Sequence, residues 1–156
     1  MSTKYVLSVD PGKATGIVMM SWDGTSDIPR VLLSKEVQPD EYAGVVEVLL
    51  NTYRNDPSLT VVCERFTINA QTVRNSQAPY SLEQIGVLKH LCRTNMYDPE
   101  KIVFQSPADA KNMFPNPVLK KLGTWHVGGE GHANDAMRHA LLRLVKTGWV
   151  PRTLLD

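Results

Sequence analysis

The order of extended and helical segments is the feature that most constrains the fold of this chain. Near its start, three apolar runs of β-type residues follow one another with only turn residues between them, which predicts an antiparallel meander. Helical and extended patterns then alternate. We expect strands over 4–10, 15–21, 30–37, 59–64 and 102–104, helices over about 40–54, 81–93 and 132–147, a loop over 65–79 and short helices within 106–124. Because strands separated by helices pair in parallel, this order predicts an α/β fold with a mixed five-stranded sheet and helices on both faces.

Length and composition suit a single domain over residues 1–156. The chain has 42% hydrophobic and 21% charged residues, enough apolar side chains to form a core. No apolar run approaches the roughly 18 residues that a membrane span needs, and the N-terminal residues do not resemble a signal peptide. Cys63 and Cys92 form neither a CxxC pair nor a zinc spacing. We therefore expect a cytoplasmic protein, from a prokaryotic cell or a phage-infected host, with two reduced core cysteines.

The net charge is only +1, but it is unevenly distributed along the chain. Residues 1–64 carry five basic and nine acidic side chains, a balance of −4, whereas residues 65–126 carry eight basic and four acidic ones, a balance of +4. An acidic segment beside a basic one suits a protein that binds metal with one part and phosphate with another. Ordinary fluctuation in surface charge explains the same pattern.

Two of the expected strands end in a carboxylate. Asp10 closes the first apolar strand before Pro11-Gly12, and Glu64 closes the apolar run Val61–Cys63. If these strands are neighbours, the carboxylates meet, and their repulsion drives one to take up a proton unless a cation lies between them. The residues alone leave an alternative for each: Asp10 can bond its own backbone in the turn, and Glu64 can form a salt bridge, for example to Arg65.

The last expected helix begins with a histidine and an aspartate. His132 and Asp135 are three positions apart, so they lie on one face of the helix, at the edge of an apolar stripe. An acidic residue in a first helical turn also favours the helix dipole, but this does not explain the histidine beside it. His139 lies one turn deeper, and we expect it to pack beside the site rather than to bind metal.

The donor atoms of these side chains indicate the kind of metal. Asp10, Glu64 and Asp135 offer oxygen and His132 offers an imidazole nitrogen, a set that suits Mg²⁺ or Mn²⁺ better than Zn²⁺. Two such ions about 3.5–4 Å apart can stabilise both the attacking and the leaving oxygen of a phosphodiester. We therefore predict a site for two Mg²⁺ ions, for which Mn²⁺ can substitute.

Three motifs resemble those of RuvC-type Holliday junction resolvases, which belong to the RNase H-like (retroviral integrase) superfamily. Residues 10–16 (DPGKATG) resemble their first-strand motif, in which an Asp ends the strand. Glu64, with Phe66 two residues on, resembles their second acidic strand end and its nearby aromatic. Residues 132–136 (HANDA) resemble their last-helix motif. Order and spacing also agree, so the resemblance covers nearly the whole chain and implies the RNase H-like fold.

The resemblance implies a structure-selective endonuclease that cuts four-way DNA junctions as a homodimer. Asp10 would bridge two metal ions, Glu64 would bind one, and His132 and Asp135 would complete the ligand set. Phe66 would stack at the junction centre. The basic side chains implied in phosphate contacts are Arg65, Arg74, Lys111, Lys120 and Lys121. Each of these can equally be an ordinary surface charge.

Other functions remain open at this point. The same fold and catalytic residues can act on flaps, replication forks or RNA–DNA hybrids. An actin- or sugar-kinase-like ATPase also has an Asp-x-Gly turn after a strand, but it needs a second lobe, for which 156 residues leave no room. A non-catalytic DNA-binding protein of this fold is the third alternative, and the four filled ligand positions argue against it.

Overall fold

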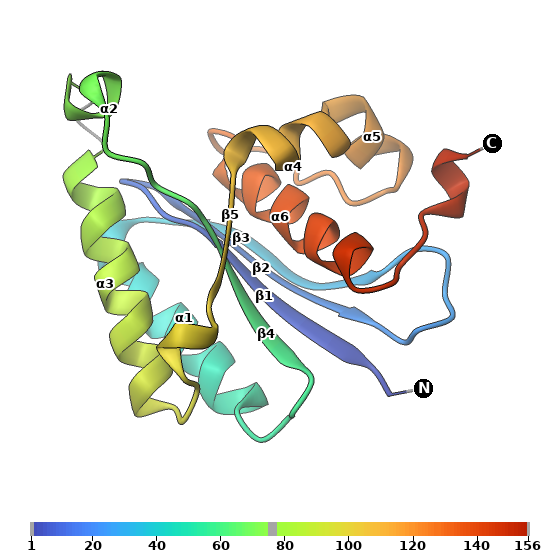
Figure 1. The fold of residues 1–156 in the computed structure, drawn as a ribbon, viewed down its shortest axis with the longest axis horizontal. Helices are drawn as coiled ribbons and strands as arrows, with labels where there is room; N and C mark the ends of the chain where they lie inside the picture. The colour runs from blue at the N-terminus through green and yellow to red at the C-terminus, as the bar shows by residue number, and fades with distance from the viewer. Residues whose placement is uncertain (1, 75–77, 156) are drawn as a thin grey trace.

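A mixed five-stranded sheet forms the centre of the computed structural model, which describes residues 2–74 and 78–155 (Figure 1). The strands are β1 (Lys4–Asp10), β2 (Thr15–Trp22), β3 (Arg30–Val37), β4 (Leu59–Glu64) and β5 (Val103–Gln105). Their order across the sheet is β3-β2-β1-β4-β5. The β1–β2 and β2–β3 pairs are antiparallel, and the β1–β4 and β4–β5 pairs are parallel. The predicted mixed sheet is therefore confirmed, and the carboxyl ends of β1, β4 and β5 lie at the same end of it.

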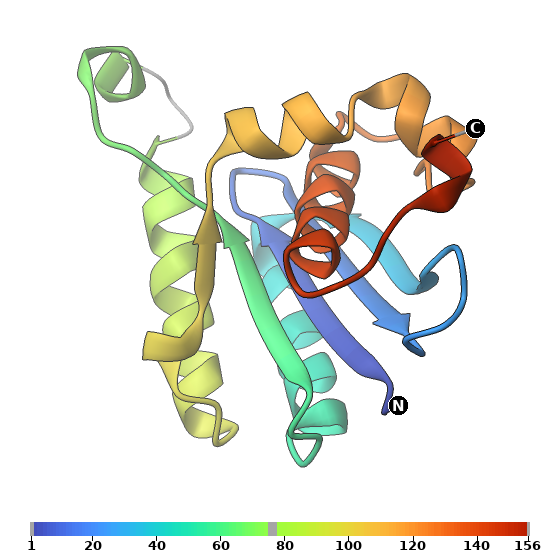
Figure 2. The same cartoon turned by 45° about the vertical axis from the view of Figure 1, so that its right-hand side comes forward.

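Helices cover both faces of the sheet, as predicted. On one face lie α1 (Pro39–Tyr53) and α3 (Ala78–Thr94), and on the other α4 (Pro107–Met113), α5 (Asn116–Lys121) and α6 (His132–Lys146), as Figure 1 and Figure 2 show. Short 3-10 helices cover Pro99–Lys101 and Arg152–Leu154. Among the described residues, no helix is both long and apolar enough to cross a membrane.

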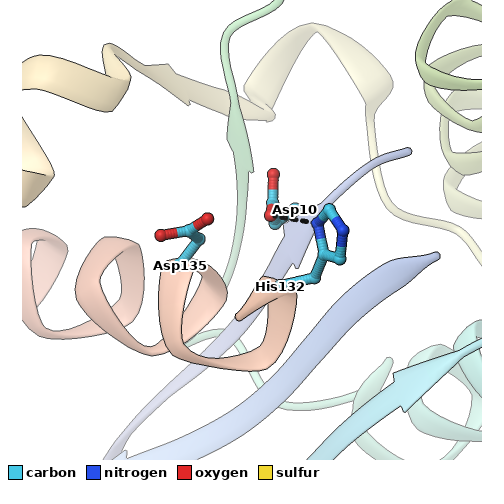
Figure 3. A group of neighbouring side chains, drawn as sticks. All are labelled: Asp10, His132 and Asp135. Carbon is cyan, nitrogen blue, oxygen red and sulfur yellow. Dashed lines mark hydrogen bonds and ion pairs between the residues drawn. The ribbon is translucent and has the colours of Figure 1, made fainter. Parts of the chain in front are cut away.

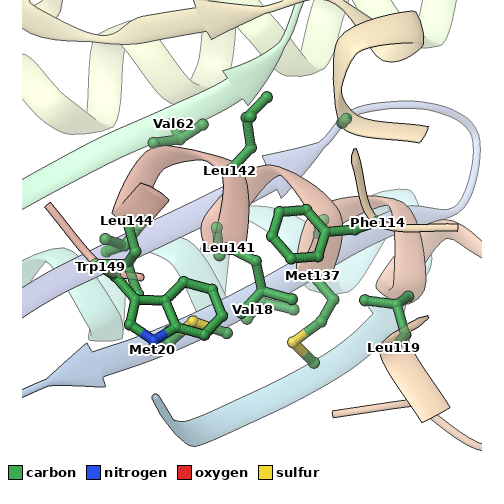
Figure 4. Packing of buried hydrophobic residues seen from close by; sticks show 14 of the residues in the cluster. Val18, Met20, Val62, Phe114, Leu119, Met137, Leu141, Leu142, Leu144 and Trp149 are labelled. Atoms are coloured by element: carbon green, nitrogen blue, oxygen red, sulfur yellow. The ribbon is translucent and has the colours of Figure 1, made fainter. Parts of the chain in front are cut away.

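The sheet separates two hydrophobic cores because successive side chains of a strand point to opposite faces. Leu7 and Val9 of β1 belong to the core under α1 and α3, whereas Val6 belongs to the core under α6. Figure 4 shows the second core, in which apolar side chains of α6 pack against the strands. Cys63 and Cys92 are free and buried in the first core. Asp10 is an even number of residues from Val6, so it shares the α6 face.

The stretch expected to be a loop over 65–79 is partly helical, so that expectation was wrong. It contains the short helix α2 (Ala70–Arg74). Asn69 caps the start of this helix, because its Oδ1 accepts hydrogen bonds from the backbone N–H groups of Gln71 and Thr72. In Figure 1, α2 lies beyond the N-terminal end of α3 and away from the sheet. Residues 75–77 of the expected loop lie outside the described residues.

The start of α3 also differs from the sequence prediction. The helix begins three residues before Ser81, because Ala78 is already helical. Ser81 is buried, and its hydroxyl donates to the carbonyl oxygen of Pro11 at 3.1 Å. This tertiary contact ties α3 to the turn that follows Asp10, beside the end of β1 where the polar residues gather.

Candidate functional site

Three neighbouring parallel strands each end in a polar residue at the same end of the sheet. Asp10, Glu64 and Gln105 are the last residues of β1, β4 and β5, and the β4–β5 register pairs Glu64 with Gln105. Ser8, on the same face as Asp10, donates its hydroxyl to the carbonyl oxygen of Ala136 in α6 at 2.7 Å. Strand alternation therefore turns these three strand-end side chains toward α6.

The first turn of α6 lies unusually close to β2. Gly16 pairs with Asp10 across β1 and β2, and a Cβ on Gly16 would lie 1.9 Å from the carbonyl oxygen of His132, so only glycine permits this approach. Glu36 of β3 accepts hydrogen bonds from the backbone N–H of His132 at 3.1 Å and of Glu130 at 2.9 Å. An anion at a helix N-terminus is favourable, so Glu36 fixes the start of α6 beside Asp10.

Asp10, His132 and Asp135 form a compact cluster in which the side chains face one another (Figure 3). His132 Nδ1 lies 3.2 Å from Asp10 Oδ2, and one ligand atom from each of the three side chains lies within 4.8 Å of the others. Glu64 lies beside this cluster, close enough to raise the pKa of both Asp10 and Asp135. Of the four residues that the sequence predicted to bind metal, the structure thus groups Asp10, His132 and Asp135 and places Glu64 of β4 next to them.

Burial and mutual repulsion change how the carboxyl groups ionise. Asp10 is only 3% exposed, and burial together with the hydrogen bond to Glu64 raises its pKa well above the ordinary value. Burial, followed by the charge of Glu64, also raises the pKa of Asp135. For Glu64, burial acts in the same direction, but hydrogen bonds from His139 and Asp10 outweigh it and hold its pKa below the ordinary value. A cation bound among these groups would favour their charged forms.

Carboxylate oxygens together with one imidazole make a donor set that can hold a divalent cation. Two carboxylates and one imidazole, from Asp10, Asp135 and His132, lie close enough to hold one ion, and the carboxylate of Glu64 lies beside them. Lys111 of α4 is close enough that its positive charge partly offsets the rise in the pKa of Asp10 and Asp135.

Arg138 is a second positive side chain near the cluster. Its Nη1 lies 2.8 Å from Asp135 Oδ1, while its Nε donates to the carbonyl oxygen of Phe114 at 2.8 Å and its Nη2 to Asn116 Oδ1. These bonds fasten Arg138 to the α4–α5 segment, and they use one oxygen of Asp135. The ion pair with Arg138 involves Oδ1 of Asp135 and not its second carboxylate oxygen.

The side chains expected to contact DNA differ in their surroundings. Arg65, Arg74, Lys111, Lys120 and Lys121 are exposed, and Phe66 is half-buried. Glu64 Oε1 lies 3.1 Å from His139 Nε2, and among the described residues no ion pair joins Glu64 to Arg65. Lys120 Nζ lies 4.8 Å from the centre of the Trp125 ring, beside a hollow of about 520 Å³ that Lys111, Asp135 and Arg138 help to line.

Sequence reasoning missed Gln105, Arg138 and Glu36. Gln105 ends an apolar run as Asp10 and Glu64 do, so the same rule would have found it if amides had been considered with carboxylates. Arg138 follows Asp135 by three positions, a spacing that brings helix side chains together. The role of Glu36 has no local signal, because it depends on a contact between β3 and the start of α6.

Comparisons with known proteins agree with this fold. No family model and no curated protein sequence matches the chain. The structure of RuvC from Thermus thermophilus is 16% identical, with a TM-score of 0.67, over 93% of this chain and 97% of that one. The same protein in complex with a Holliday junction substrate matches with a TM-score of 0.64, over 93% and 96%. A complex of the fowlpox virus resolvase with Holliday junction DNA is 12% identical, with a TM-score of 0.54, over 90% and 99%. The chain therefore has the RuvC-like RNase H fold that its motifs predicted.

Proposed function

We propose that this chain is a metal-dependent endodeoxyribonuclease that cuts branched DNA, with the four-way Holliday junction as its substrate. One observation carries the proposal: Asp10, Glu64, His132 and Asp135 converge at one end of a sheet whose fold is shared with two resolvases in complex with Holliday junction DNA. Fold alone does not determine activity, so the proposal depends on this convergence of side chains.

The four side chains would hold two Mg²⁺ or Mn²⁺ ions. Asp10 lies next to both His132 and Glu64, so it would be the central ligand of this set, with Glu64, His132 and Asp135 as the others. Bound ions would supply the positive charge that stabilises the transition state of phosphodiester hydrolysis and would lower the pKa of a nearby water. The protein keeps the carboxylates oriented and partly shielded from solvent, which strengthens their interaction with a cation.

Basic side chains around the cluster would orient the DNA. Lys111 lies close enough to the carboxyl groups to affect their pKa values, so its ammonium group is well placed to attract the phosphate that is cut. Arg65, Arg74, Lys120 and Lys121 would contact flanking phosphates, and Phe66 would stack on a base. A homodimer would present two such sites to opposed strands of one junction, in the cytoplasm, where DNA is accessible.

A cleavage panel tests the proposed function. The purified chain is incubated with labelled four-way junctions, flaps, forks and RNA–DNA hybrids, with Mg²⁺, with Mn²⁺ and with a chelator. We expect symmetric paired nicks in the junction only when a metal is present. Asp10→Asn should bind the junction but leave it uncut, because it loses one ligand charge without changing the side-chain volume. Glu83→Gln, an exposed change in α3, is the control that should cut normally.

The panel also separates the alternatives. Equal cutting of junctions, flaps, forks and hybrids would show an RNase H-like nuclease of broader substrate range. Binding of junctions without any cutting by the wild-type chain would show a non-catalytic DNA-binding protein. Cutting by Asp10→Asn at the wild-type rate would rule out the metal mechanism.

A further inference from the structure

Behind Glu64, on the side away from Asp10, lies a buried pair of polar side chains. His139 of α6 is 0% exposed and Gln105 of β5 is 2% exposed. His139 Nε2 lies 3.1 Å from Glu64 Oε1, and His139 Nδ1 lies 3.1 Å from Gln105 Nε2. Gln105 Nε2 also donates to the backbone carbonyl oxygen of His139 at 2.9 Å. The three residues therefore form a continuous chain of hydrogen bonds from β5 to the candidate metal site.

The donors and acceptors among Glu64, His139 and Gln105 allow only one position of the proton on the imidazole ring of His139. The side-chain amide nitrogen of Gln105 can donate hydrogen bonds but cannot accept one, so His139 Nδ1 must be the acceptor in this pair. The proton then lies on Nε2, which donates to the Glu64 carboxylate. Rotating the amide by half a turn would bring Gln105 Oε1 against the carbonyl oxygen of His139, two acceptors with no hydrogen between them.

We propose that Gln105 and His139 are positioning residues for metal binding: Gln105 fixes the Nε2–H tautomer of His139, and His139 then holds one oxygen of Glu64 so that the other is available to a cation. This inference rests on the proposed metal site and extends it to two residues that do not touch substrate or metal. Such outer partners orient ligands and set their basicity in metal sites generally.

The composition of this core indicates that the pair does more than fill space. The other residues of α6 that face the sheet are mostly aliphatic or methionine, and a leucine at 139 with an apolar residue at 105 would suit such a core. Instead, Gln105 Oε1 is buried without a hydrogen-bond donor among the residues that the structure describes. An unpaired buried oxygen is unfavourable, and its presence is explained if the amide nitrogen is needed to direct His139.

Two measurements test the proposal, and neither depends on DNA cleavage. In the wild-type chain, long-range proton–nitrogen NMR spectra of the imidazoles report which ring nitrogen carries the proton, and His139→Leu identifies the signal among the four histidines. The affinity for Mn²⁺ is measured by calorimetry for the wild-type chain and the variants. We expect the Nε2–H form in the wild-type chain, and Mn²⁺ affinity about 10–100-fold lower in His139→Leu and Gln105→Met.

A rescue variant and a control separate positioning from general packing. His139→Gln keeps a donor that can reach Glu64, so it should recover part of the Mn²⁺ affinity that His139→Leu loses. His90→Leu, an exposed change in α3, should bind Mn²⁺ like the wild-type chain. A merely structural role would lower the unfolding temperature of His139→Leu without weakening Mn²⁺ binding by the folded protein.

The outcomes distinguish this inference from the proposed function. If the wild-type chain cuts junctions but His139 carries its proton on Nδ1, or His139→Leu binds Mn²⁺ as tightly as the wild-type chain, the inference is overturned and the function stands. If the tautomer and the loss of Mn²⁺ affinity are as expected but no junction is cut, the inference stands and the proposed substrate is wrong.

Discussion

Asp10 is the residue at which folding and the proposed chemistry oppose each other. Its side chain is buried at the end of β1, next to Glu64 and near Asp135, and burial is the main reason why its pKa is raised. Such a carboxyl group destabilises the metal-free fold whenever it ionises, because its charge lacks both water and a cation. A bound divalent cation would remove this penalty, so metal binding and folding should be coupled at this residue.

Asp10→Asn should therefore stabilise the metal-free protein at neutral pH. Because the folded-state pKa of Asp10 is raised above the ordinary 3.8, its contribution to stability is full below pH 3.8 and is lost as pH rises through the folded-state pKa. Asparagine cannot ionise, so we expect a gain of about 1–3 kcal/mol in unfolding free energy at pH 7, or roughly 2–4 °C in melting temperature per kcal/mol. The gain should shrink toward acidic pH.

Thermal melts with a chelator and with Mn²⁺ provide the check. Mn²⁺ should stabilise the wild-type chain more than Asp10→Asn, which lacks the central ligand charge. Lower stability of metal-free Asp10→Asn at pH 7 would contradict the account of this residue.

Among the contacts between helices and strands, the close approach of α6 to β2 is the one that places His132 and Asp135 beside Asp10. Gly16→Ala would place a methyl group 1.9 Å from the carbonyl oxygen of His132, so one of the two backbones must shift. We expect a loss of about 1–3 kcal/mol in unfolding free energy and a fall in cleavage rate, because His132 and Asp135 move away from Asp10. Urea denaturation measures the first effect and the junction assay the second.

Gly44→Ala is a matched control with the opposite expected sign. Gly44 lies inside α1, where a Cβ would meet no atom within 4 Å, so alanine should stabilise the helix by roughly 0.5–1 kcal/mol and leave cleavage unchanged. Equal effects of the two substitutions on unfolding free energy and cleavage would show that the contact between β2 and α6 does not hold His132 and Asp135 in place.

Local patterns were enough to predict most of these elements and the four clustered side chains. Asp10 and Glu64 end apolar strands, and His132 and Asp135 share a helix face, so periodicity and spacing place them. The capping by Glu36 could not be predicted in this way, because its partners belong to a segment distant in sequence. The contact between Ser81 of α3 and the turn after β1 likewise joins segments distant in sequence, so local patterns could not predict it.

At the scale of the whole molecule, the proposed activity requires two copies of the chain. Each copy would bring one set of Asp10, Glu64, His132 and Asp135, and resolving a junction needs paired cuts on opposed strands. We expect the protein to sediment as a dimer, at twice the chain mass of 17.4 kDa, at concentrations where it makes paired nicks. Analytical ultracentrifugation with and without junction DNA measures this mass. A protein that stays monomeric on the junction while making paired nicks would contradict the dimer.

The central claim is that side chains from β1, β4 and α6 together bind the divalent ions. Crystals of the wild-type chain soaked in Mn²⁺, with data collected near the manganese absorption edge, test it most directly. The account predicts two anomalous peaks among Asp10, Glu64, His132 and Asp135, and a loss of at least one peak in Asp10→Asn. Manganese bound elsewhere, with none among these four side chains at saturating concentration, would contradict it.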